Sequence, residues 1–175
     1  MAKTKRVKRY YRPKSKWSAN ISEFSSQSGV LTQNSTFHLE STLATNPSQT
    51  TLGVSQIYTV KNFEINFEFD SDGTSGLITS VENLTAYIMF LPQGMTVTEN
   101  LNTEHPEYIM AYQYYGSPQP DTPNYGVRKI KSRMARKLNT GDSIILFIKG
   151  YNAGSTSNNN PFAIHGLVRW WTKAN

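Results

Sequence analysis

Cysteine is absent from this chain of 175 residues. Its absence excludes disulfide bonds, thiolate metal sites and a cysteine nucleophile. Long hydrophobic runs are missing too, because the longest uninterrupted aliphatic and aromatic stretch is Ile144–Ile148. A membrane-spanning helix needs about 20 apolar residues, so we expect no membrane insertion. The length fits one domain with a core of its own.

Histidine is scarce, and the three histidines, His38, His105 and His165, lie in unrelated contexts. None has a His-x-x-x-His spacing, and no Gly-x-x-x-x-Gly-Lys phosphate loop is present. Hydrolysis would need a base poised beside a nucleophile. We therefore predict no enzymatic activity, no cofactor and no metal site. His165 alternates with Leu167 and is interpreted as a core or interface residue rather than a ligand.

Acidic residues are missing from positions 1–17, which hold eight of the 18 lysines and arginines. Residues 18–175 carry ten bases and twelve acids, a net charge of −2. A cationic tail on a slightly acidic body is typical of a segment that meets a polyanion. We therefore divide the chain into a basic arm, residues 1–17, and a body, residues 18–175. Like charges should keep the free arm disordered until it binds a partner.

Aromatic side chains alternate with the cations of this arm and offer faces on which unpaired bases can stack. Such stacking contributes roughly 1–3 kcal/mol per base and tolerates any sequence, whereas phosphate contacts weaken with salt. Lys5-Arg6-Val7-Lys8 also fits a short nuclear-import signal. The alternative is a solvated tail that only aids solubility. The predicted nucleic-acid-binding residues are Lys3, Lys5, Arg6, Lys8, Arg9, Tyr10, Tyr11, Arg12, Lys14, Lys16 and Trp17.

The body is dominated by patterns typical of β-strands. From Phe63 to Asp70, four apolar residues alternate with four polar ones, which predicts a half-buried strand. No convincing helix and no repeat are found, so we predict an all-β sandwich of eight or nine strands. The other candidate strands are Trp17–Phe24, Thr36–Leu43, Val54–Val60, Leu84–Leu91, Tyr108–Tyr115, Ser143–Tyr151 and Phe162–Thr172.

Val127–Leu138 can be read as a strand or as a basic amphipathic helix, because Ile130, Met134 and Leu138 share one side in both readings. We favour a strand that forms a hairpin with Ser143–Ile148 through the turn Asn139–Asp142. Its cations are either solvated or meet nucleic acid or an acidic neighbour. As a strand, it places Lys129, Lys131, Arg133 and Lys137 opposite the apolar side and Arg128 and Arg136 at the flanks of that side.

The last predicted strand carries Trp170 and Trp171, which fall on opposite faces and cannot both lie in one core. The outer tryptophan is a candidate subunit interface residue. The alternative is that a loop of the same subunit covers it.

The chain resembles the coat proteins of small circular, Rep-encoding single-stranded DNA viruses, the circovirus and nanovirus group. The resemblance rests on the arm, on the run Val127–Leu146, on the short length and on the final segment Gly166–Lys173. It implies an eight-stranded jelly roll, a T=1 icosahedral shell of sixty copies, nuclear entry through the arm and packaging of circular single-stranded DNA. The arm departs from the circovirus pattern because it is shorter and richer in lysine.

Three hypotheses follow for the function. The first is a capsid protein that forms a homo-oligomeric shell, packages single-stranded DNA, with RNA not excluded, and occurs in the virion and in the host nucleus, where it meets an import receptor. The second is a non-assembling β-domain that binds single-stranded nucleic acid on a strand face. The third, an attachment domain like that of a lectin, leaves the arm without a purpose.

Overall fold

The computed structural model describes residues 16–27, 34–46, 57–71, 81–116, 127–153 and 162–174. Two short helical turns, α1 (Leu101–Glu104) and η1 (Pro106–Tyr108), lie between strands, and no helix of the described residues is long and apolar enough to cross a membrane. The strands are β1 (Ser18–Gln27), β2 (Ser35–Thr45), β3 (Tyr58–Ser71), β4 (Val81–Leu91), β5 (Ile109–Gly116), β6 (Arg128–Ser132), β7 (Arg136–Leu138), β8 (Ser143–Asn152) and β9 (Phe162–Ala174).

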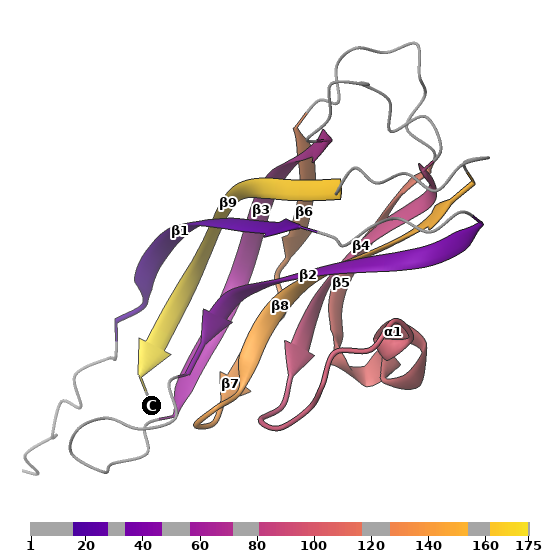
Figure 1. Cartoon of the computed structure of the whole chain (residues 1–175). Coiled ribbons are helices and arrows are strands. Elements are labelled where there is room, and N and C mark those ends of the chain that lie inside the picture. The colour runs from indigo at the N-terminus through magenta and orange to yellow at the C-terminus, as the bar shows by residue number, and fades with distance from the viewer. Residues whose placement is uncertain are drawn as a thin grey trace, which may run out of the picture.

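The strands form two antiparallel sheets that face each other (Figure 1). The first sheet has the order β1-β9-β3-β6, and β7 also pairs with β3; the second has the order β2-β8-β4-β5. β6 and β7 lie along the same edge of β3, so nine strands fill eight positions. Most consecutive strands of the chain lie in opposite sheets, which is the strand order of a jelly roll. The predicted all-β jelly-roll sandwich is confirmed.

The core between the sheets is built by strand alternation. Phe63, Ile65 and Phe67 of β3 are buried as predicted, and they face Ile144, Leu146 and Ile148 of β8 within one hydrophobic cluster. Burying each such side chain contributes about 1.5–3 kcal/mol. The expected strands Val54–Val60 and Phe63–Asp70 meet in one strand, β3, which begins at Tyr58, because a bulge at Asn62, with a φ of 54°, shifts the register without ending the pairing. Residues 54–56 lie outside the described residues.

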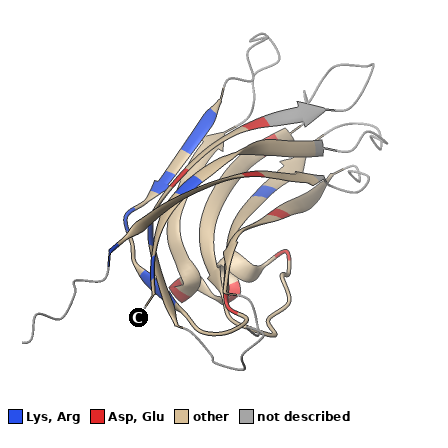
Figure 2. Ribbon diagram, turned by 90° about the vertical axis from the view of Figure 1, so that its left-hand side faces the viewer, with Lys and Arg blue, Asp and Glu red and all other residues tan. Residues whose placement is uncertain are grey.

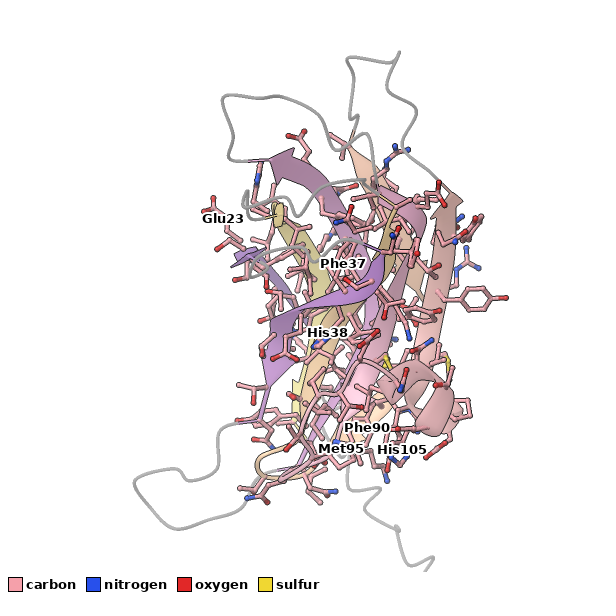
Figure 3. All side chains as sticks on the ribbon, turned by 45° about the vertical axis from the view of Figure 1, so that its right-hand side comes forward. Glu23, Phe37, His38, Phe90, Met95 and His105 are labelled. Carbon is pink, nitrogen blue, oxygen red and sulfur yellow. The ribbon has the colours of Figure 1, made fainter. Side chains whose placement is uncertain are left out.

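β8 is buried on both of its faces, which explains the apolar run Ile144–Ile148. On the outer face of the second sheet, Ile145 and Phe147 pack with Met89 and Leu101. Leu101 belongs to α1, which the sequence analysis did not predict. The connection from β4 to β5 therefore covers part of this sheet, as the labelled Met95 and His105 beside α1 show (Figure 3).

The segment 127–138 is extended, as favoured, but its details differ from the prediction. β6 and β7 are separated by residues 133–135, and Met134 in this break is 46% exposed instead of buried with Ile130 and Leu138. The predicted hairpin is wrong, because β7 pairs with β3 in the first sheet whereas β8 pairs with β2 and β4 in the second. The turn crosses between the sheets.

Asp142 holds the turn at which the chain passes from one sheet to the other. Its carboxylate, in a residue only 5% exposed, accepts hydrogen bonds from the backbone N–H of Asn139 at 2.8 Å and of Gln93 at 3.0 Å. The backbone of Asn46 binds the same turn, because its N–H donates to the Asp142 carbonyl and its carbonyl accepts from the N–H of Gly141. Three segments distant in sequence are thereby tied together, a contact that turn propensity alone does not reveal.

Candidate nucleic-acid interface

Most of the predicted arm residues, Lys3 to Lys14, lie outside the described residues, and so does the candidate import signal Lys5–Lys8. Lys16 is exposed and Trp17 is 37% exposed. Both directly precede β1, an edge strand of the first sheet. The arm is therefore joined to the edge of this sheet.

Most lysines and arginines of the body lie on the outer face of the first sheet. Lys129 and Lys131 flank the buried Ile130 and point away from the core, and Arg133 and Lys137 are exposed as well. Within the strands of the second sheet, Lys149 is the one lysine or arginine. Figure 2 shows most of the blue positions on the sheet that ends at the C-terminus. Three further cations of the first sheet are Lys61, Arg169 and Lys173.

Glu64 on β3 partly neutralises this face. Its carboxylate lies 2.9 Å from Lys131 Nζ and 3.9 Å from Lys129 Nζ. The hydrogen bond from Lys131, followed by the charge of the same lysine, lowers the pKa of Glu64. Because these ion pairs lie at the surface and are screened by solvent, phosphates can compete with Glu64 for the two lysines.

Arg128 and Arg136 lie toward the inner side of the sheet, at the flanks of the apolar side as predicted. The Arg128 guanidinium lies 5.7 Å from the centre of the Tyr115 ring, and that of Arg136 lies 5.6 Å from the centre of the Phe90 ring. Arg136 also donates a 2.7 Å hydrogen bond to the carbonyl of Glu107. The predicted basic segment is therefore divided into four outward cations and two that pack against aromatic rings.

Burial affects the tyrosine beside Arg128. It raises the pKa of Tyr115 to about 12, although the charge of Arg128 acts in the opposite direction. The neutral hydroxyl donates a 3.0 Å hydrogen bond to the carbonyl of Lys129. Tyr115 thus joins β5 of the second sheet to the backbone of β6 in the first sheet.

The two adjacent tryptophans divide as expected between the faces of β9. Trp170 packs against the core and stacks on Phe63, with ring centres 6.3 Å apart and an interplanar angle of 4°. Trp171 lies on the outer face, where the Arg169 guanidinium is 4.5 Å from its ring centre. Trp170 is therefore covered by its own subunit, and Trp171 remains the interface candidate.

Where the arm joins the sheet, four side chains come together that the strand patterns did not predict to be neighbours. We call this group the Trp cluster, and it consists of Trp17, Lys61, Arg169 and Trp171. Lys61 Nζ is 3.9 Å from the centre of the Trp17 ring. The alternation Arg169, Trp171, Lys173 on one strand face could have indicated part of the cluster. Lys61 could not be found in this way, because its place depends on the register of β3 with β9.

The histidines do not meet. His38 on β2 stacks on Phe147, whereas His105 beside α1 lies 3.1 Å from Glu107 (Figure 3). His165 is exposed on the face of β9 opposite the core, 3.7 Å from Glu68, so of the two places expected for it the core is wrong and the interface stays a prediction. In the described part of the chain, no three His, Asp or Glu side chains are grouped to hold a metal ion.

A hollow of about 580 Å³ lies near His165. Its walls include Glu23 and Glu68 together with apolar residues such as Phe24 and Leu167. Two carboxylates make this hollow unfavourable for phosphate. The cationic region of the first sheet therefore lies apart from it, toward β6, β7 and the Trp cluster.

Comparisons with known proteins add two distant likenesses. No family model matches the chain, and no curated protein matches it. The decameric BFDV capsid protein is 8% identical, with 93% of this chain and 99% of that chain covered and a TM-score of 0.35. A chain from turnip yellow mosaic virus is 12% identical, with 89% and 95% covered and a TM-score of 0.23.

Proposed function

We propose that this chain is a capsid protein that assembles into a small icosahedral shell around single-stranded DNA. The observation that carries the proposal is the separation of charge across the sandwich. The cationic arm joins the edge of the first sheet, whose outer face carries most of the described cations, while Lys149 is the one lysine or arginine in the strands of the second sheet. A subunit with one cationic side is suited to line a lumen filled with polyanion.

The magnitude of the charge agrees with packaging. Each arm holds eight cations, so a T=1 shell of sixty copies carries about 480 positive charges on its arms, enough to neutralise several hundred phosphates. The fold alone does not select this function, because jelly rolls also occur in lectins and cupins. The arm is the feature that those alternatives leave unexplained.

Two finer parts of the proposal concern the arm. We infer that Lys5–Lys8 binds a nuclear-import receptor, so that the protein passes through the host nucleus before assembly. We also infer that the arm binds nucleic acid without sequence preference, since lysine and arginine contact phosphate and aromatic rings stack on any base.

A second candidate function is favoured by the Trp cluster. Cations and aromatic rings on a strand face are what a non-assembling module for single-stranded nucleic acid would present. Deletion of residues 1–15 separates the two functions. A capsid protein should still form particles but package much less nucleic acid, whereas a module should stay monomeric and retain most of its binding. Particle formation is read by electron microscopy and content by the ratio of absorbance at 260 and 280 nm.

A further inference from the structure

The Trp cluster is assembled from three strand regions on the outer face of the first sheet. Trp17 precedes β1, Lys61 belongs to β3, and Arg169 and Trp171 belong to β9, which lies between them. Trp171 is paired in register with Ala19 on one side and with Lys61 on the other. The Lys61 side chain therefore reaches across β9 to place its ammonium 3.9 Å from the centre of the Trp17 ring.

The core does not account for these two indole rings. Trp170 already fills the inner position on β9 and stacks on Phe63, whereas Trp17 is 37% exposed and Trp171 lies outside the core. Each ring is held by a cation, Lys61 for Trp17 and Arg169 for Trp171. The rings are thus ordered at the surface, and they keep accessible area that a planar ligand can cover.

The charge around the rings indicates the ligand. Lys16 precedes Trp17, Lys173 follows Trp171 on the same face, and both Lys61 and Arg169 contact the rings. The acid paired in register with Arg169 is Glu64, which is already hydrogen-bonded to Lys131. Aromatic faces among cations suit a ligand that has both flat rings and negative charge.

We propose that Trp17 and Trp171 form a stacking platform for unpaired nucleobases, with Lys61 and Arg169 contacting the adjoining phosphates. This inference rests on the nucleic-acid binding proposed above and deepens it. In a duplex the base faces are covered by their neighbours, so the platform selects single strands, which phosphate contacts alone do not do. The body, and not only the arm, then takes part in recognition.

The test compares two ligands for the full chain: oligothymidylate, and an abasic oligonucleotide with the same number of phosphates. Binding is measured by fluorescence anisotropy at fixed salt. The wild-type protein should bind oligothymidylate at least fivefold more tightly, because the abasic strand offers phosphates but no rings to stack. A double variant, Trp17→Leu and Trp171→Leu, should lose most of this preference and keep only the part that stacking on Tyr10 and Tyr11 of the arm supplies, while abasic binding stays nearly unchanged.

Two control variants test whether the preference depends on the aromatic rings at positions 17 and 171. Tyr112→Leu removes an exposed aromatic residue from the second sheet and should leave the affinity ratio as in the wild type. Trp17→Phe with Trp171→Phe keeps aromatic rings and should recover most of the ratio. The chain has three tryptophans, so the Leu variant retains only Trp170. Oligothymidylate should quench tryptophan fluorescence in the wild type and hardly at all in that variant.

Several outcomes would overturn the platform. Equal affinities for the two ligands in the wild type would mean that binding is electrostatic alone. An unchanged ratio in the Leu variant would place the stacking elsewhere. If the Leu variant no longer forms particles but keeps the wild-type affinity ratio, the Trp cluster is a contact between subunits. The proposed function can fail independently of the platform. If the chain prefers oligothymidylate to the abasic strand but never assembles, the platform stands and the capsid function is wrong. If it assembles without this preference, the capsid function stands and the platform is wrong.

Discussion

The outward cations of β6, β7 and the break between them give a prediction whose size follows from the structure. Lys129, Lys131 and Lys137 are exposed on the outer face of the first sheet, and Arg133 is exposed in the break between the two strands. Each phosphate contact on a single strand contributes about 0.7 to the slope of log affinity against log salt. Replacing all four by Gln should therefore reduce that slope by about 2–3. The substitution also leaves Glu64 without its lysine partners, which adds repulsion of phosphate.

The assay is a titration of the full chain with labelled oligothymidylate at a series of salt concentrations. Lys149→Gln is the control, because Lys149 lies on the second sheet and donates to the Glu99 carbonyl and to Asn100 Oδ1. Its slope should equal that of the wild type. If the four-residue variant also keeps the wild-type slope, its cations are merely solvated and the assigned face is incorrect.

Three further predictions concern the body. Asp142→Ala leaves the part-buried N–H groups of Gln93 and Asn139 without their charged acceptor, so urea unfolding should show a loss of about 3 kcal/mol. A loss under 1 kcal/mol would refute the role of Asp142 in this turn. Trp170→Ala should cost about 3 kcal/mol and Trp171→Ala much less in the same assay, whereas equal losses would contradict the division of their faces. Lys131→Gln should raise the pKa of Glu64, read by NMR titration. Because that pKa is lowered in the folded chain, the small stability it provides is present at neutral pH and lost as pH falls through it; an unchanged pKa would exclude the pair.

Most of the fold could be predicted from the alternation of apolar and polar residues along the strands. The apolar residues of β3 point inward, and Lys129 and Lys131 of β6 and Lys137 of β7 point outward, as their period of two indicates. The jelly-roll order was expected through the family resemblance and not through periodicity, because which strands pair is a long-range property. The same limit explains the wrong hairpin, since a tight turn looks alike in sequence whether it joins strands of one sheet or crosses between two.

The site was only partly predictable. The arm and the basic segment are visible as charge, and the opposite faces of Trp170 and Trp171 follow from their adjacency. Lys61 was missed because its contact with Trp17 depends on three neighbouring strands and on the bulge at Asn62. The inward packing of Arg128 and Arg136 follows from aromatic residues supplied by β5 and β4, which local patterns do not report.

The size of the particles formed by the purified full chain tests the central claim most directly. Mass photometry, with electron microscopy of the same sample, measures it in the presence of single-stranded DNA. The account predicts closed shells of about sixty subunits, which at 19.8 kDa each amount to about 1.2 MDa of protein, with DNA inside and protected from nuclease. A chain that stays monomeric with and without DNA would contradict it.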